Sequence, residues 1–144
     1  MLVSQILKSK PTHDLLWVRP SDAVTEAVKM MSENRVGTVI VSKDGQSLDG
    51  ILSERDVVRE LGRQDASILA KPVSDLMTAK LVTCTESDSS ESVLERMTQG
   101  RFRHMPVMND REILGLISIG DVVKAQLAEL AMEKDALEGM IMGR

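Results

Sequence analysis

Two stretches of the chain, 50–58 and 115–123, repeat the pattern Gly-x-x-Ser-x-x-Asp-Val-Val. In each, the residues before the serine indicate a strand and those after it indicate a helix. Ser-x-x-Asp at the start of a helix is a capping box, in which serine and aspartate exchange side-chain-to-backbone hydrogen bonds. The same helix N-terminus attracts phosphate through its free N–H groups and dipole, and a carboxylate one turn on can hold a ribose diol. The two interpretations are compatible, because capping fixes the geometry that a ligand would use.

The two stretches belong to a longer internal repeat. Residues 17–41 align with residues 83–107 at an offset of 66, and most aligned pairs keep their polarity. The serine–aspartate stretches align at an offset of 65, so the single-residue change falls in the polar loops between strands, where insertions are tolerated. The chain is therefore a duplication.

Each copy is predicted to form a βαββα unit. The expected strands are residues 16–18, 38–42 and 48–52 in the first copy and 81–83, 104–108 and 113–117 in the second. The first helix of each copy is expected to have a Ser-Asp N-cap, at 21–22 or 87–88, and to end at Asn34 or Gly100. The second helices are expected to start near Asp56 and Asp121, and a short helix is expected from Pro72 through Met77.

A single unit of this size is marginal, whereas two units packed face to face would form one adequate core. The predicted fold class is α/β, or α+β in some classifications: tandem repeats around a pseudo-twofold axis with a long C-terminal helix. The expected division is 1–72, an N-terminal extension plus the first repeat, and 73–144, the second repeat plus the C-terminal helix.

The C-terminal helix is expected to run from Asp121 to about Met142. Along it, residues spaced 4-3-4-3-4 form a stripe that is apolar except for one lysine: Val123, Leu127, Leu130, Lys134, Leu137 and Ile141. The stripe packs on the body of the same chain in one interpretation, and on a second copy of the chain in the other. Fewer than three heptads are too few for an independent coiled coil.

Composition excludes several classes of function. A net charge of −4 over 144 residues argues against broad nucleic-acid binding, which needs a basic face, and against a membrane-surface role. The single cysteine, Cys84, cannot form an internal disulfide. The apolar run at residues 1–8 is too short for a signal peptide, and no stretch approaches the length of a membrane span. The expected location is the cytoplasm, and with two His and one Cys no metal-ligand spacing is found.

The duplicated pattern and the run Arg-Phe-Arg-His-Met-Pro-Val at 101–107 resemble a pair of CBS domains, named for cystathionine β-synthase. The resemblance covers roughly residues 10–128 and is closest to small stand-alone bacterial CBS-pair proteins. It implies a regulatory module that requires no cofactor and binds AMP, ATP or an NAD(H)-type compound, AMP foremost, in clefts between the repeats. It also implies a homodimer that acts on a protein target.

The resemblance assigns roles to residues at the two clefts. Carboxylates that bind ribose hydroxyls are Asp56 and Asp121; hydroxyls that meet phosphate are Ser53 and Ser118; added positive charge comes from Arg55 in one site and from Arg103 and His104 in the other. Residues expected to line adenine are Thr83 with Met105 and Pro106, or Trp17 and Val18 with Val39 and Ile40.

The two copies differ at these positions. The first has Trp17, Thr38 and Ile40 where the second has Thr83, His104 and Pro106. Trp17 either stacks on a base or fills the pocket. The second copy keeps the pattern of the family, so the resemblance supports its site better.

Three classes of function compete. The first is a sensor of an adenosine compound; the second is a ligand-independent dimerising scaffold in which the serine–aspartate motifs are helix caps. The third is an enzyme, which the sequence disfavours, because nothing in it assembles a nucleophile, a base and an oxyanion site.

Overall fold

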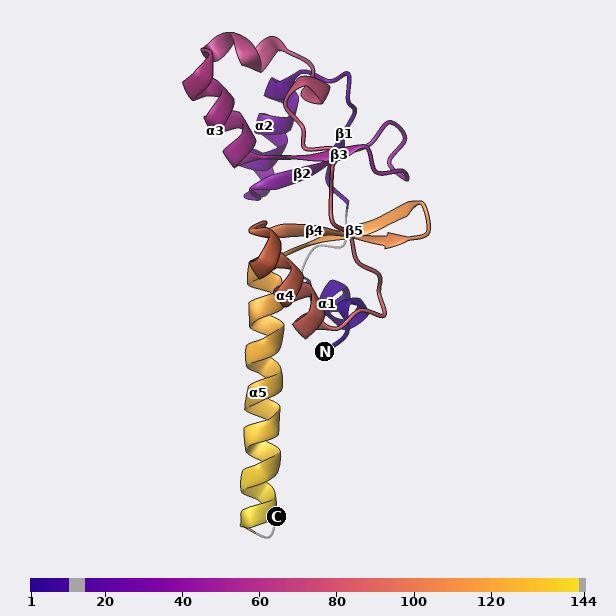
Figure 1. The fold of residues 1–144 in the computed structure, drawn as a ribbon, viewed down its shortest axis with the longest axis vertical. Helices are drawn as coiled ribbons and strands as arrows, with labels where there is room; N and C mark the ends of the chain where they lie inside the picture. Colours follow the sequence, from indigo (N-terminus) through magenta and orange to yellow (C-terminus); the bar gives the residue numbers. More distant parts are fainter. Residues whose placement is uncertain (11–14, 143–144) are drawn as a thin grey trace.

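Strands and amphipathic helices form two lobes in the computed structural model, which describes residues 1–10 and 15–142 (Figure 1). The first lobe contains β1 (Trp17–Val18), α2 (Val24–Asn34), β2 (Thr38–Val41), β3 (Gly50–Ser53) and α3 (Glu54–Arg63). The second contains α4 (Ser90–Gly100), β4 (His104–Asn109), β5 (Glu112–Ser118) and α5 (Ile119–Ile141), together with α1 (Val3–Ser9) from the N-terminus. Between the lobes in sequence lie two 3₁₀ helices, η1 (Ala66–Ala70) and η2 (Val73–Asp75).

The strands of the two lobes meet in the middle of the molecule, and the helices lie outside them (Figure 1). In the first lobe β1 runs parallel to β2, and β2 pairs with β3 in antiparallel register. In the second lobe β4 and β5 form an antiparallel pair with a register shift between Val107 and Met108. The Ile113 N–H donates to the Gln46 carbonyl (2.7 Å), which joins the two lobes through their backbones. The predicted fold class, a tandem repeat with a long C-terminal helix, is confirmed.

The prediction of a strand at residues 81–83 is wrong, and the absence of this strand is explained by Pro106. In the first lobe the Ile40 N–H donates to the Leu16 carbonyl at 3.0 Å. Pro106 occupies the position equivalent to Ile40 and has no N–H, so the matching bond cannot form. What is left of the strand is a single parallel bridge between Cys84 and Val107.

The Ser-Asp pairs do not cap helices α2 and α4. The helices begin later, after Ala23 and Ser89. The carboxylates of Asp22 and Asp88 instead accept backbone N–H groups three residues upstream, at 2.8 Å in both copies, and so fix the turn before each helix. The predicted ends at Asn34 and Gly100 are confirmed.

The leading segment of each repeat packs on the other repeat. Val3 and Ile6 of α1 are buried in the second lobe, whereas Val73 and Leu76, around η2, are buried in the first. The bonds that hold the segments are equivalent: the Val3 N–H donates to the Asp88 carbonyl (2.9 Å) and the Val73 N–H to the Asp22 carbonyl (2.8 Å). Each core is therefore completed by a segment from the other half of the sequence. The helix expected from Pro72 through Met77 is reduced to the short 3₁₀ turn η2.

Helix α5 runs out of the body of the molecule toward the C-terminus (Figure 1). Val122 and Ala125 are its buried residues among those described, and Leu127, Leu130 and Leu137 are exposed. The interpretation in which the stripe packs on the body of the same chain is therefore wrong.

Candidate functional site

A cavity of about 730 Å³ lies between the two repeats. The first repeat lines it with the segment that leads from α2 into β2, the second with parts of β4 and β5 and with the start of α5, and the N-terminal segment with α1 and Lys10. At the C-cap of α2 Arg35 adopts a left-handed conformation (φ 54°), which ends the helix and turns the chain into β2. Arg101 does the same after α4 (φ 56°), so both repeats make this turn alike.

Ser118 and Asp121 line the cavity where β5 feeds into α5. The Asp121 N–H donates to Ser118 Oγ (3.1 Å), and the Ser118 N–H donates to Asp121 Oδ2 (2.9 Å). This is the capping box that the sequence predicted, and its two hydrogen bonds fix both side chains at the N-terminus of α5.

Lys10 reaches the same carboxylate. Its Nζ lies 3.0 Å from Asp121 Oδ2 and donates to the Leu116 carbonyl at 2.8 Å. Burial works to raise the pKa of Asp121, but the Ser118 N–H and the Lys10 ammonium outweigh it and hold the pKa below its ordinary value. Asp121 is therefore ionised at neutral pH and already has a cation bound.

His104 joins the repeats at the wall of the cavity. Its Nδ1 lies 3.2 Å from Thr38 Oγ1 of the first repeat. Burial, and then the positive charge of Lys10, lower the pKa of His104, while Asp121 and Glu54 oppose the shift. The imidazole is therefore neutral at neutral pH and contributes hydrogen bonding to the wall, with no charge.

Fixed charges in the cavity lining are positive on balance. Lys8, Lys10 and Arg35 face Glu86 and Asp121. Apolar side chains make up much of the remaining wall: Leu7, Leu15, Leu16, Val36, Ile40, Leu114 and Leu116. A cavity with this lining suits an anion that carries an apolar, planar part.

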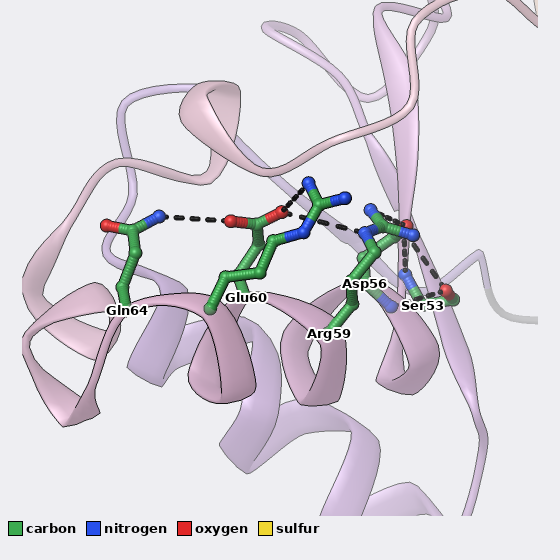
Figure 2. Close-up of polar contacts among 6 residues, drawn as sticks. Ser53, Asp56, Arg59, Glu60 and Gln64 are labelled. Carbon is green, nitrogen blue, oxygen red and sulfur yellow. Dashed lines mark hydrogen bonds and ion pairs between the residues drawn. The ribbon is translucent and has the colours of Figure 1, made fainter.

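At the equivalent corner of the first repeat, the capping carboxylate of Asp56 is engaged by Ser53 and by Arg59 of the same helix (Figure 2). The Ser53 N–H and Oγ each donate to Asp56 Oδ2 at 3.0 Å, and Arg59 donates to Asp56 Oδ1 at 2.9 Å. Glu60 lies beside Arg59 (3.5 Å) and continues the network along α3. Asp56 is buried and both its oxygens have partners, one of them a cation one turn along the same helix.

Five residues of the expected sites line the cavity: His104, Ser118, Asp121, Thr38 and Ile40. The structure therefore brings Thr38 and Ile40, expected at the first site, together with the corner of the second repeat. Ser53, Arg55 and Asp56 lie at the corner of the first repeat, outside this lining.

Four other expected residues lie outside this lining. Val18, Val39, Met105 and Pro106 are buried residues of the strands, and their role as ligand contacts stays a prediction. Thr83 and Arg103 are outside the lining; the Thr83 carbonyl accepts from Arg96 (2.9 Å) and the Arg103 carbonyl from Ile119 (2.8 Å).

Trp17 also lies outside the cavity lining. A Cβ built on Gly45 would approach Trp17 Cζ2 to 2.8 Å, so the indole covers the turn between β2 and β3, where Gly45 has φ +78°. The Arg19 guanidinium stands 5.8 Å from the ring centroid. Trp17 neither stacks in nor fills this cavity: it packs on a turn.

The sequence reasoning missed Lys8, Lys10, Arg35 and Gly37 as lining residues. A signal for Lys10 does exist, because residues 3–10 (VSQILKSK) match residues 73–80 (VSDLMTAK). These two segments align at a different offset from the strands and helices, so a comparison at the offset of the strands and helices does not detect the match.

Two repeats with exchanged leading segments and a cavity between them define a tandem-repeat protein with an inter-repeat cavity. A family model for the CBS domain matches residues 3–63 and again residues 73–128. The chain belongs to the CBS domain family and contains a pair of these domains.

Among curated relatives, the mitochondrial CBS domain-containing protein CBSX3 of Arabidopsis thaliana is 38% identical over 148 residues, which cover 98% of this chain and 72% of that protein. Other relatives from the same plant are much longer, and the chain spans 22% of their length. A solved CBS-domain protein of Burkholderia ambifaria is 39% identical, with a TM-score of 0.82 over 89% of this chain and 95% of that one. The structure of CBSX2 in complex with AMP is 28% identical, with a TM-score of 0.73 over 88% of this chain and 96% of that one.

Across residues 1–10 and 15–142, no helix combines the length and the apolar character that crossing a bilayer requires.

Proposed function

We propose that this protein is a regulatory module that binds an adenine nucleotide, AMP foremost, in the cavity between its two repeats. The observation that carries the proposal is the corner at the start of α5, where the Ser118 hydroxyl and the Asp121 carboxylate line a cavity of about 730 Å³. A volume of this order falls within the roughly 300–1,000 Å³ usual for small-molecule sites.

Each part of a nucleotide has a partner in this lining. The Asp121 carboxylate suits a ribose diol, and the α5 N-terminus with Ser118 suits a phosphate. Lys8 and Arg35 add positive charge to the lining, and the apolar wall around Ile40 accepts a purine ring. The AMP complex of the related CBSX2 supports AMP as the first ligand to test.

In the ligand-free site, Lys10 is paired with the carboxylate that is expected to bind the ribose. The Ser118 N–H and the Lys10 ammonium both contact Asp121 Oδ2, so a ribose diol either uses Oδ1 or displaces the ammonium. A phosphate on the ligand gives the displaced ammonium a new partner, whereas a neutral nucleoside does not. The site is therefore expected to favour adenosine phosphates over adenosine.

The action of the module is regulatory, exerted on another protein. The polar groups of the corner are engaged in capping and ion pairing, and no nucleophile with a base beside it lines the cavity among the described residues. Binding therefore has to act by changing the relative stability of arrangements of repeats or chains.

A thermal-shift panel of AMP, ADP, ATP, NADH and adenosine tests this function. A ligand at about 100 times its Kd adds about 2.7 kcal/mol to stability, which raises the Tm by roughly 5–10 °C at this chain length. AMP is expected to give such a shift, and Asp121→Ala to remove most of it.

Asp56→Ala is the matched control, since it deletes the equivalent capping carboxylate at a corner outside this cavity. Both variants lose about 1 kcal/mol of baseline stability with the cap, but Asp56→Ala is expected to keep the response to AMP. If no adenine compound shifts the wild-type Tm, the proposal is wrong. If Asp56→Ala alone abolishes the response, the ligand binds at the other corner.

A second candidate is a dimerising scaffold that works without a ligand, and the exposed stripe of α5 favours it. Under this function all adenine compounds leave the Tm unchanged while the chain is a dimer in solution.

A further inference from the structure

Helix α5 projects from the body toward the C-terminus (Figure 1), and among the described residues its last ion pair with the body is the one between Glu129 and the Met1 amino group. Its last buried residue among those described is Ala125, yet the helix continues to Ile141. An unsupported helix of this length is marginal in water, because most helical stability in proteins comes from packing an apolar face. The projecting part therefore needs a partner.

The exposed stripe on α5 has the spacing of a coiled-coil seam. Leu127, Leu130 and Leu137 are about 60% exposed and Ile141 is 79% exposed. With Leu127 at an a position, Leu130 and Leu137 fall at d and Lys134 and Ile141 at a. A seam of this type pairs with another helix that carries the same repeat. Fewer than three heptads are too few for isolated helices, but each α5 is already anchored in its lobe through Val122 and Ala125, which lowers the cost of ordering it.

We propose that α5 pairs with α5 of a second copy of this chain, in antiparallel orientation. The stripe spacing reads the same in both directions, so every stripe residue meets a stripe residue of the partner. Val123 then faces Ile141 of the partner subunit, Leu127 faces Leu137 of the partner subunit, and Leu130 faces Lys134 of the partner subunit.

Charge decides between the two orientations. A parallel pair would place Lys134 against the partner's Lys134 in the seam and Glu133, at g, beside the partner's Glu138, at e. Each of these contacts is repulsive, and the second occurs twice. The parallel arrangement is therefore disfavoured.

The antiparallel pair has better charge complementarity. It brings Lys124 beside the partner's Glu138, twice by symmetry, and leaves a single contact of like charge between Glu133 and the partner's Glu133. In the single chain the Lys134 ammonium lies 3.9 Å from Glu138 Oε1, one turn along the same helix. This pairing is independent of nucleotide binding, because it uses the part of α5 beyond the cavity.

The full-length chain gives the test of the seam. Leu130→Glu and Met132→Glu introduce the same charge at positions that are 61% and 62% exposed, but only Leu130 lies on the stripe. Light scattering after gel filtration is expected to give wild type and Met132→Glu about twice the 15.9 kDa protomer mass, and Leu130→Glu the protomer mass. Circular dichroism verifies that both variants stay folded. A monomeric wild type, or a Leu130→Glu variant that remains a dimer, overturns the proposal.

Cysteine cross-linking tests the orientation. Leu127→Cys and Leu137→Cys are made separately, and the native Cys84 is buried, so the unsubstituted chain is the blank. In the antiparallel pair neither variant alone forms a disulfide-linked dimer under mild oxidation, whereas an equimolar mixture does. Cross-linking of each variant with itself would show the parallel pair and overturn the proposed orientation.

Discussion

The Thr38 hydroxyl lies 3.2 Å from Nδ1 of His104, and these two residues occupy equivalent positions in the two repeats. A pseudo-twofold axis relates the repeats, so it passes between these two side chains. Each is also paired across its own hairpin with the serine of the capping box, Thr38 with Ser53 and His104 with Ser118. One contact on the axis thus connects the two strand-to-helix corners.

Protonation of His104 is expected to weaken the protein. Burial lowers the pKa of His104 in the folded state, whereas the unfolded chain has a pKa of about 6.5. Below that pH the unfolded chain binds more protons, so stability falls as the pH drops toward the folded pKa, by at most about 1.4 kcal/mol per pH unit. Above pH 6.5 this contribution is constant.

Urea unfolding between about pH 7.5 and pH 5.5 measures the effect, with His104→Gln as the comparison. The glutamine side chain keeps a hydrogen-bonding group near Thr38 but does not titrate. The free energy of unfolding of the variant is expected to change less with pH over this range than that of the wild type. An equally steep profile in the variant would assign the pH dependence to another group.

The Lys10–Asp121 ion pair is expected to contribute modestly to stability. Both side chains are partly exposed, so solvent screening limits their coupling to about 0.5–1 kcal/mol. A double-mutant cycle of wild type, Lys10→Met, Asp121→Asn and the double variant isolates this value, because each single change also alters helix capping or packing. A higher salt concentration is expected to reduce the coupling free energy between Lys10 and Asp121.

Lys80→Met is the control for this cycle. Lys80 matches Lys10 in the duplicated segments, is exposed, and is outside the cavity lining. It is expected to show no coupling to Asp121. Coupling of the same size for Lys80 would mean that the cycle reports a general charge effect.

Truncation of Ile6 in α1 is expected to destabilise the other half of the sequence. Ile6 is 1% exposed and packs in the second lobe, so Ile6→Ala leaves a cavity that costs roughly 2–5 kcal/mol. Hydrogen exchange is expected to accelerate most in β4 and β5, about 100 residues away in sequence.

Leu76→Ala is the mirror-image variant, since Leu76 completes the core of the first lobe. It is expected to accelerate exchange most in β2 and β3. If either variant loosened mainly the repeat that follows it in the sequence, the exchange of leading segments would be refuted.

The sequence predicted the βαββα duplication, the ends of α2 and α4 and both capping boxes, because these depend on contacts within a few residues. It could not predict which cleft residues meet. Thr38 and Ile40 were assigned to the first site, yet they line the cavity with Ser118 and Asp121, since the packing of the repeats decides this. The strand expected at 81–83 is absent because Pro106 has no backbone N–H to donate. A pattern of apolar residues does not reveal a missing hydrogen-bond donor.

Lys10 was missed for a similar reason. Its role depends on α1 docking on the second lobe, and α1 is too short for its periodicity to be recognised alone. The indole ring of Trp17 predicted either stacking on a base or filling of a pocket, whereas its position against Gly45 follows from the shape of one turn.

The exchange of leading segments also constrains how the chain assembles during synthesis. Residues 1–9 are synthesised before the residues from Cys84 to Ala125 that form the core accepting them. The N-terminal segment must therefore wait without its native contacts until most of the chain has emerged, and such long-range contacts form slowly. The two repeats therefore cannot complete their folding one after the other, because a segment made before both repeats packs only on the later one.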